Sequence, residues 1–396
     1  MTPRVVAVFV GTRADLGPLG PVISAVADAP DLTLKVLTGV MYAAHDLAAA
    51  LPGPRSAEDW LRSIVPLAAP MQAVTPESEV AQGALLAAAT GRAIRDERVD
   101  VLVVLGDRWE LLDVVPPAFL LGVPIVHLHG GEVTEGAVDE RVRHAVTKLA
   151  DEHCVASVDA AARLRQLGEP PDRVHVTGAP GLDRLASADA MTHAELAGLV
   201  GLPAIERPLA LFTYHPPTTA APEEAAAGAR AALEATLEVC GSVIATQPGM
   251  DAGRDGILAA LDELGREHPE RLAVVPALGR DYPRVLAAVD VVVGNSSSGI
   301  IEAATVGVPA VDVGDRQRGR LRGDNVLHSA EGRTHVAQAL REAVSPDFRQ
   351  RAGQVTNPYG TGAAAHRILD IVRRAGSAGR AKPFVDLDCT PKERHG

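Results

Sequence analysis

The stretch VVVGNSSSGIIEAA, residues 291–304, contains the pattern from which the fold can be predicted. Its first residues are β-branched and apolar, as in a strand that is buried on both faces of a parallel sheet. Residues 294–299 then supply a turn of small and hydroxyl-bearing residues, and a helix is predicted to begin directly after it. Free N–H groups at a helix start favour an anion and serine hydroxyls add donors, so a diphosphate fits this turn.

The residues of this turn have two interpretations. Ser296, Ser297, Ser298 and Gly299 are candidates for holding a diphosphate, and Glu302 is placed to accept a hydrogen bond from a ribose hydroxyl. In the alternative interpretation, a serine of the turn only caps the helix.

The same pattern continues along the chain, because short β-branched runs alternate with longer Ala- and Leu-rich amphipathic stretches. This alternation is typical of parallel sheets covered by helices, so we predict an α/β fold. A first set of strands is predicted at residues 5–10, 32–36, 101–105, 125–128, 154–156 and 174–176. A second set is predicted at residues 209–213, 243–246, 272–275, 291–293 and 308–313. Helices are predicted to start near Pro18 and to cover residues 76–95, 139–150, 223–240, 281–288 and 363–374.

Length and charge restrict the organisation and the partners. A chain of 396 residues is too long for one core of ordinary size, so two similar domains are expected, residues 1–200 and 201–362. The helix at 363–376 is expected to return to the first domain, and residues 377–396 form a polar, loosely held tail. The formal net charge is −12 and no basic run offsets it, so we expect neither nucleic acid nor a membrane surface as partner.

The cysteines and the apolar runs indicate the compartment. Cys154, Cys240 and Cys389 are far apart and form no paired motif, which fits a reducing environment. The apolar run at residues 5–10 is too short for a membrane span and lacks the features of a signal peptide. We therefore expect a cytoplasmic protein.

Glycine stands beside a charged or hydrogen-bonding residue after nearly every predicted strand. Ligands of parallel α/β sheets bind at the carboxyl ends of the strands, so these segments mark the predicted site. The segments are residues 11–15, 106–108, 129–132, 215–217, 294–299 and 314–316.

Several of these segments carry groups for acid–base chemistry. The titratable candidates are Asp107, His129, Glu132, Asp139, Glu140 and His215. Asp139 begins a predicted helix, where it either caps the helix or projects into a cleft between the two halves. Carboxylates beside histidine suit general acid–base work at carbon or at a glycosidic oxygen.

Other chemistries are less well supported. No GxGxxG follows a strand and no GxxxxGK[ST] is present, so neither a dinucleotide fingerprint nor a Walker A loop is predicted. His127 and His129, with Glu132, have metal-like spacing. However, the sequence fixes no third ligand, and His127 is equally a packed histidine. We predict no metal.

The segments resemble in order the motifs of a known family. They are GTRAD (11–15), GDRWE (106–110), HLHGGEVTEGAVDERVRHAVTK (127–148), QLGE (166–169), HP (215–216), DAG (251–253), GNSSSGIIE (294–302), GDRQRGR (314–320) and NPYG (357–360). Together they resemble the UDP-N-acetylglucosamine 2-epimerase family, and more closely its hydrolysing branch in the sialic-acid pathway.

The resemblance implies two Rossmann-like domains that face each other across a cleft, as in GT-B glycosyltransferases. It also implies site residues. The catalytic set would be Asp107, Asp139, His215 and either His129 or Glu132, because some relatives have a catalytic Glu where His129 stands. The set that binds uridine diphosphate would be Arg13, Arg108, His215, Ser296, Ser297, Ser298, Gly299, Glu302, Arg316 and Arg320.

The implied reaction converts UDP-N-acetylglucosamine, or a related UDP-2-acetamido sugar, and water to the free manno-configured sugar and UDP. UDP is eliminated to give a glycal, which is then hydrated, and no cofactor is required. Relatives are commonly homo-oligomers, and some act on 2,4-diacetamido-6-deoxy sugars on routes to legionaminic acid. The alternatives are a non-hydrolysing epimerase, a GT-B glycosyltransferase and a non-catalytic UDP-sugar sensor.

Overall fold

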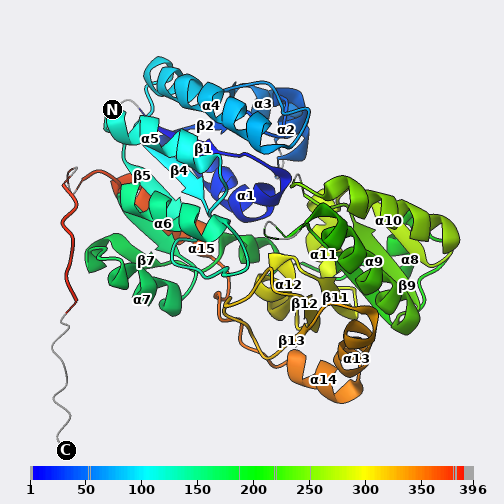
Figure 1. Ribbon diagram of the computed structural model, residues 1–396. Helices are drawn as coiled ribbons and strands as arrows, with labels where there is room; N and C mark the ends of the chain where they lie inside the picture. Colours follow the sequence, from blue (N-terminus) through cyan, green and yellow to red (C-terminus); the bar gives the residue numbers. More distant parts are fainter. Residues whose placement is uncertain are drawn as a thin grey trace, which may run out of the picture.

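The computed structural model describes residues 3–51, 53, 55–186, 188–217, 219, 221–249, 251–377, 379 and 381–387. Cys389 lies outside these residues. The chain forms two α/β domains side by side, each built on a parallel sheet with helices on both faces (Figure 1). The predicted fold class, two Rossmann-like domains of the GT-B type, is confirmed.

The N-terminal sheet has, among the described residues, seven strands in the order β3-β2-β1-β4-β5-β6-β7, all parallel. Its strands are β1 Arg4–Phe9, β2 Leu32–Thr38, β3 Ile64–Pro66, β4 Val101–Leu105, β5 Ile125–Leu128, β6 Glu152–Val155 and β7 Val174–Val176. Alternate residues of β1 point to opposite faces. Val6 and Val8 therefore pack with α1 and α15, whereas Ala7 and Phe9 pack with α4 and α5.

The C-terminal sheet, counted over the same described residues, has six parallel strands in the order β10-β9-β8-β11-β12-β13. Its strands are β8 Leu209–Thr213, β9 Ser242–Thr246, β10 Leu272–Val275, β11 Val291–Gly294, β12 Ala310–Val313 and β13 Val326–Ser329. Helices α9, α10 and α13 cover one face, and α8, α11 and α12 cover the other. The short strands β3 and β13 were not predicted, because each has only a few buried residues at a sheet edge.

The helices of the first domain are α1 Arg13–Asp28, α2 Ala44–Ala50, α3 Ala57–Leu61, α4 Pro76–Asp96, α5 Leu111–Leu121, α6 Asp139–Leu149 and α7 Val158–Gln166. Those that follow are α8 His193–Val200, α9 Pro222–Val239, α10 Arg254–Glu267, α11 Tyr282–Leu286, α12 Ser297–Ile301, α13 Arg333–Ala343, α14 Pro346–Ala352 and α15 Ala364–Arg374. Short 3₁₀ helices lie at η1 Pro171–Arg173, η2 Pro180–Arg184, η3 Gly279–Asp281 and η4 Ala303–Val306.

Helix α1 begins earlier than predicted. The expected start near Pro18 is wrong, because the helix begins at Arg13 and contains Pro18. The carboxylate of Asp15 accepts hydrogen bonds from the backbone N–H groups of Gly11 and Thr12, at 2.9 and 2.8 Å. This cap starts the helix directly after the first strand and places Arg13 at the edge of the sheet.

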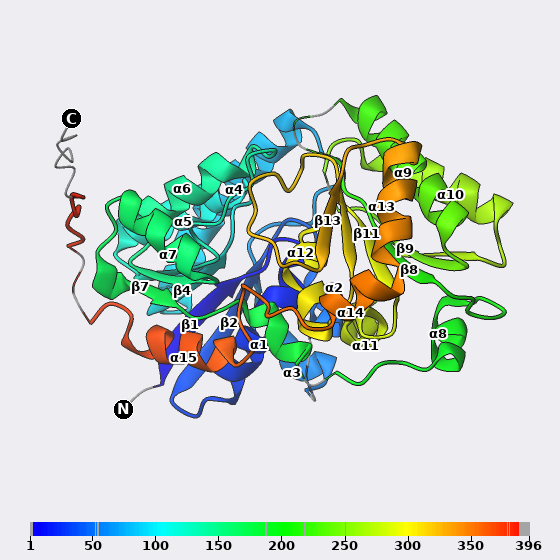
Figure 2. The ribbon, with the colours of Figure 1, turned by 90° about the horizontal axis from the view of Figure 1, so that it is seen from below.

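The end of the chain returns to the first domain. Figure 2 shows α15 beside α1 and β1, and its apolar side chains Ile368 and Val372 belong to the same core as α1. The described part of the tail is held more firmly than expected, because Lys382 donates to the buried carboxylate of Glu169 at 2.7 Å. The Val385 N–H also donates to the Gly168 carbonyl at 2.9 Å.

Each sheet has one switch point, which is the central pair of strands from which the strand order runs in opposite directions. The first sheet grows outward in both directions from β1 and β4, and the second from β8 and β11. Crossovers diverge at such a switch point, which leaves a crevice at the carboxyl ends of the two central strands.

Candidate active site

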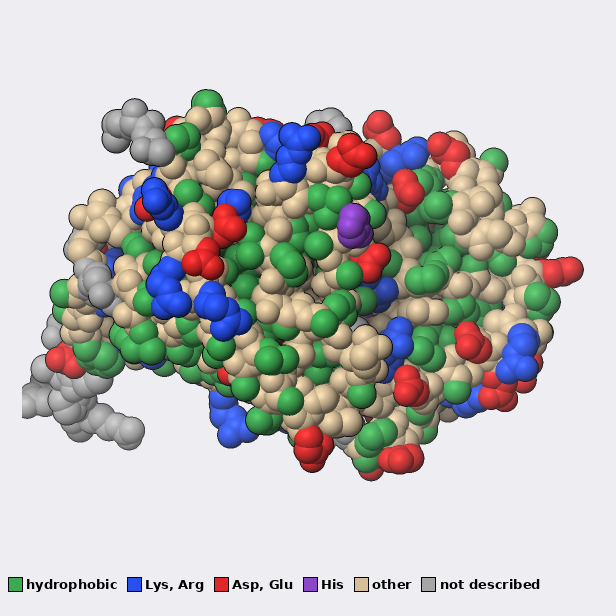
Figure 3. Space-filling model, turned by 90° about the horizontal axis from the view of Figure 1, so that it is seen from above, with side chains coloured by type: hydrophobic (Ala, Val, Ile, Leu, Met, Phe, Trp, Pro, Cys, Tyr) green, Lys and Arg blue, Asp and Glu red, His purple; other side chains and the backbone are tan. Residues whose placement is uncertain are grey.

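The predicted site segments gather at these two switch points. Gly11 and Asp107 follow β1 and β4, whereas His215 and Asn295 follow β8 and β11. Figure 3 shows one histidine among acidic and basic side chains near the middle of the face that it presents. Side chains of the two carboxyl-end edges contact one another, so the edges form one polar site.

Contacts across the domains hold the two edges against each other. The guanidinium of Arg13 donates to the carbonyl oxygens of Pro276 and Gln247, the second at 2.8 Å. The guanidinium of Arg108 lies 3.4 Å from a carboxylate oxygen of Asp251. Burial lowers the pKa of Arg13, and the nearby Arg254 lowers it further.

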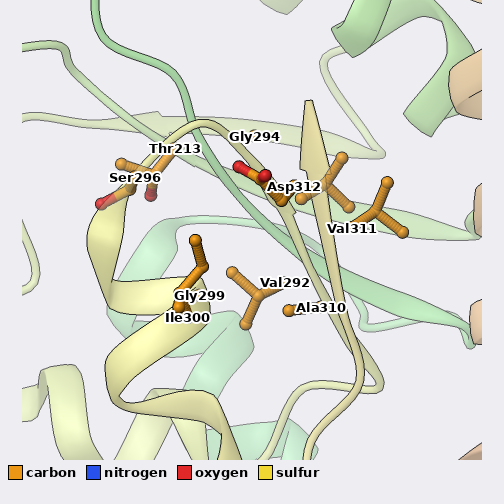
Figure 4. Close-up of a pocket in the computed structure, with 10 residues that line it drawn as sticks. Thr213, Val292, Gly294, Ser296, Gly299, Ile300, Ala310, Val311 and Asp312 are labelled. Carbon is orange, nitrogen blue, oxygen red and sulfur yellow. The ribbon is translucent and has the colours of Figure 1, made fainter. Parts of the chain in front are cut away.

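The serine turn is fixed by its neighbours at the switch point. The Asn295 side chain accepts from the His215 N–H at 2.7 Å and donates to the His215 carbonyl at 2.8 Å. Gly294 has φ +131°, and a Cβ there would collide with the Thr213 carbonyl, so glycine is required where β11 passes β8. Figure 4 shows Ser296 and Thr213 at the top of the turn, with Val292 and Ala310 below them.

The capping interpretation of the turn is confirmed, whereas the diphosphate interpretation stays a prediction. Ser296 caps α12, because its hydroxyl accepts from the Ser298 N–H at 3.4 Å. Helix α12 has only five residues, so its dipole is weaker than expected for a long helix. A guanidinium supplies the stronger charge: Arg316 donates to the Asn295 carbonyl at 3.1 Å and so lies beside the turn.

His215 has a neutral ring. Burial, together with the charge of Arg316, lowers the pKa of His215 to about 3. Its Nδ1 accepts from the Gly249 N–H at 2.9 Å, so in the neutral ring the proton is on Nε2. The site thus offers hydrogen-bond donors to an anion from His215, Arg316 and the serine turn. Of these groups, only Arg316 carries a positive charge.

Asp107 and Asp139 lie close enough to influence each other, and their pKa values move apart. Burial opposes ionisation of Asp107, but Arg143 and Arg320 outweigh it and hold its pKa below the ordinary value. Burial raises the pKa of Asp139, and the negative charge of Asp107 raises it further. One carboxylate is therefore kept ionised beside one that holds its proton more readily.

Arg143 is a site residue that the sequence analysis missed. It is fully buried on α6, donates to the carboxylate of Asp107, and lies 2.6 Å from both the Glu132 carbonyl and the Glu140 carboxylate. It stands four residues after Asp139, which places both on one face of the helix. That spacing was the available signal.

His129 and Glu132 form a buried pair. Nδ1 of His129 lies 2.5 Å from Oε1 of Glu132, and Oε2 of Glu132 lies 3.1 Å from a guanidinium nitrogen of Arg320. Although burial favours the neutral acid, His129 and Arg320 lower the pKa of Glu132 to about 2. Arg320, which the resemblance implied as a residue that binds uridine diphosphate, is therefore paired with Glu132.

His127 packs into the domain. Its Nε2 lies 2.8 Å from the Gly106 carbonyl oxygen and its Nδ1 lies 3.3 Å from the Thr147 hydroxyl. Burial lowers the pKa of His127 to about 3. The described residues contain no group of three or more His, Cys, Asp or Glu side chains that could hold a metal ion.

Glu302 lies on the side of α12 that faces the first domain. Its Oε1 rests against Gly17 of α1 and Gly181 of η2. Burial raises the pKa of Glu302 to about 7, because the Tyr282 hydroxyl and the charge of Arg184 lower it only in part. Glu302 thus lies between α1 and the second domain.

Comparisons with known proteins agree along most of the chain. A family model described as UDP-N-acetylglucosamine 2-epimerase matches residues 69–373. The chain is 30% identical over 371 residues to the UDP-N,N'-diacetylbacillosamine 2-epimerase (hydrolyzing) of Legionella pneumophila, covering 92% of this chain and 94% of that protein. It is 30% identical over 391 residues to the UDP-N-acetylglucosamine 2-epimerase of Neisseria meningitidis serogroup B, covering 96% and 98%.

A solved structure shares the fold. The crystal structure of UDP-GlcNAc 2-epimerase from Neisseria meningitidis bound to UDP-GlcNAc matches with a TM-score of 0.72 and 18% identity, over 94% of this chain and 100% of that chain. Among the residues described here, no helix is both long and apolar enough to cross a membrane.

Proposed function

Since the chain belongs to the UDP-N-acetylglucosamine 2-epimerase family, we propose that it is an epimerase of the hydrolysing type. It converts UDP-N-acetylglucosamine, or a related UDP-2-acetamido sugar, and water to the free manno-configured sugar and UDP. The names of relatives at 30% identity and the UDP-GlcNAc bound to a structural neighbour support a UDP-sugar substrate. The observation that carries the proposal is the pairing of Asp107 and Asp139, with oppositely displaced pKa values, beside a donor-rich turn.

The elimination step uses the ionised carboxylate. Asp107 takes the proton from C2 of the sugar, the C–H electron pair forms the C1=C2 double bond, and the C1–O pair leaves with UDP. Arg316, Arg108, His215 and the serine turn stabilise the charge that develops on the diphosphate. Asp139 keeps its proton more readily, so it can return one to the opposite face of C2. Addition of water at C1 then yields the free manno sugar.

Isotope exchange tests the proposed function directly. We expect incubation with UDP-N-acetylglucosamine in deuterated water to give UDP and free N-acetylmannosamine that carries deuterium at C2. NMR monitors the products. A deuterated product that keeps its UDP would indicate a non-hydrolysing epimerase. Binding without C2 exchange would indicate a glycosyltransferase or a sensor.

A second substrate is needed to identify the substituents at the 4- and 6-positions of the sugar. The Legionella pneumophila relative is named for UDP-N,N'-diacetylbacillosamine, so that sugar nucleotide is tested beside UDP-N-acetylglucosamine. The substrate with the higher kcat/KM identifies the sugar class.

Asp107→Asn and Asp139→Asn are each expected to lower kcat for UDP release by about 100- to 10,000-fold, because each removes a proton-transfer group. Binding of UDP, measured by calorimetry, is expected to remain. Asp262→Asn, at an exposed position of α10, is the matched control and keeps the parental rate. Near-normal rates in both site variants would refute the assignment of these carboxylates.

We further propose that the enzyme works in the cytoplasm as a homo-oligomer. Cys154 and Cys240 are buried and unpaired, as in proteins of reducing compartments. Size-exclusion chromatography with light scattering measures the oligomeric state.

A further inference from the structure

His129 has an unusual backbone conformation. Its φ is +60°, in the left-handed region that few non-glycine residues adopt. The His129 N–H donates to the Cys154 carbonyl at 3.1 Å, which anchors this conformation at the end of β5. Such backbone strain persists where the surrounding structure enforces it, and it often marks a functional side chain.

Glu132 cannot itself move a proton in this arrangement. One of its carboxylate oxygens lies against Nδ1 of His129 and the other against Arg320, and all three side chains are buried. A carboxylate held ionised by two such partners neither donates a proton nor has a free oxygen to accept one. Its function must be exerted through His129.

The contact with Glu132 determines the tautomer of His129. Because the ionised carboxylate only accepts, Nδ1 carries the proton and Nε2 keeps its lone pair. Nε2 is buried and has no hydrogen-bond partner among the residues that the structure describes. The charges of Glu132 and Arg320 act on Asp107, so the pair lies close to the candidate base.

The proposed reaction needs a third proton-transfer group. Asp107 is protonated once it has taken the C2 proton, and Asp139 gives its own proton to C2 during hydration. The water that adds at C1 must lose a proton at the same time, and a separate base is required to accept it.

Resting on the proposed function, we propose that Nε2 of His129 is the general base that activates this water, and that Glu132 and Arg320 are positioning residues. The water O–H bond breaks and its proton goes to Nε2, while the oxygen electron pair forms the C1–O bond. The C1=C2 electron pair takes the Asp139 proton at C2. The imidazolium that results is balanced by the carboxylate of Glu132.

Arg320 also links this base to the arrangement of the domains. Glu132 belongs to the first domain, whereas Arg320 lies in the loop after β12 of the second domain. Residues of both domains therefore position the base.

The test separates elimination from hydration. Glu132→Gln is expected to keep UDP release within a few-fold and its KM near the parental value, while 2-acetamidoglucal accumulates. Formation of the free manno sugar is expected to fall by about 100-fold or more. UDP and both sugars are followed together by NMR. Glu135→Gln is the matched control, because Glu135 pairs with Arg318 of the same loop at 3.4 Å but is exposed.

A second variant keeps the test decisive if Glu132→Gln does not fold. His129→Gly suits the left-handed backbone at φ +60° and leaves the Glu132–Arg320 pair in place. Added imidazole is expected to restore hydration in His129→Gly, which a merely structural defect would not allow.

Two outcomes overturn the inference while the proposed function stands. In one, the variants form the free sugar at the parental rate. In the other, UDP release falls together with sugar formation and no glycal appears, so that the pair acts in elimination. If the parent protein itself releases no UDP from either sugar nucleotide, the proposed function fails instead.

Discussion

Asp107 and Asp139 carry the same carboxyl group, yet their neighbours drive the two pKa values apart. Burial disfavours the charge on both. At Asp107 the guanidinium groups of Arg143 and Arg320 outweigh burial, whereas at Asp139 the charge of Asp107 adds to it. Arg143 and Arg320 therefore favour Asp107 as the ionised carboxylate, which is why we propose it as the base.

Arg143→Gln tests this control at the level of one residue. Arg143 lowers the pKa of Asp107, so its removal raises that pKa and Asp107 becomes protonated at a higher pH. The acidic limb of the kcat/KM profile is expected to move upward by about one pH unit or more. Arg141→Gln, at an exposed position of the same helix, is expected to leave the profile unchanged. An unmoved acidic limb in folded Arg143→Gln would contradict the assignment of Asp107 as base.

At the scale of elements, α15 shows how a helix far along the chain completes the first domain. Its apolar side chains fill the core beside α1, and its first two N–H groups are satisfied by another element. The carboxylate of Asp183 in η2 accepts from the N–H groups of Ala364 and Ala365 at 2.9 and 2.8 Å. Helix α15 packs against α1, and α1 begins with Arg13 of the candidate site. The packing of α15 therefore also supports this part of the candidate site.

Asp183→Ala removes this cap and is expected to lower the free energy of unfolding by about 1 kcal/mol, because two helix N–H groups lose their acceptor. Urea denaturation measures the change. Asp370→Ala, on the exposed face of α15, is the control and is expected to change stability by less than about 0.5 kcal/mol. Equal effects of the two substitutions would show that Asp183 does not cap the helix.

At the scale of the whole molecule, Lys382 ties the segment 381–387 to the outer edge of the first domain. The carboxylate of Glu169 is fully buried and contacts Lys148 at 2.6 Å, His153 at 2.9 Å and Lys382 at 2.7 Å. Although burial favours its neutral form, these partners lower the pKa of Glu169 to about 2. The tail therefore neutralises a charge that the first domain buries.

Lys382→Ala is expected to lower the free energy of unfolding by about 2 kcal/mol, because it removes a buried charged hydrogen bond from Glu169. Lys148→Ala is the comparison, since the Lys148 side chain is 43% exposed and that of Lys382 only 13%. We expect the larger loss for Lys382→Ala in thermal and urea unfolding. A loss no greater than that of Lys148→Ala would contradict the larger contribution that we expect from the buried contact.

Much of the architecture follows from local patterns. Buried β-branched runs predicted the central strands of both sheets, and the polar residues after them lie together at the edge that we propose as the site. The start of α1 was misplaced because a proline suggested a first turn, while the Asp15 cap acts one turn earlier. The strands β3 and β13 escaped prediction because an edge strand needs few apolar residues.

The alternating strands and helices, and the residue types at the strand ends, can be predicted from local patterns, because hydrophobic periodicity is a local record of burial. The charge pairs cannot be predicted in this way. Arg143 with Asp107, Arg320 with Glu132 and Lys382 with Glu169 are pairs between distant segments. Such pairs depend on how the sheets and domains close, and pKa values follow from burial and charge in that closed arrangement, which no local pattern encodes.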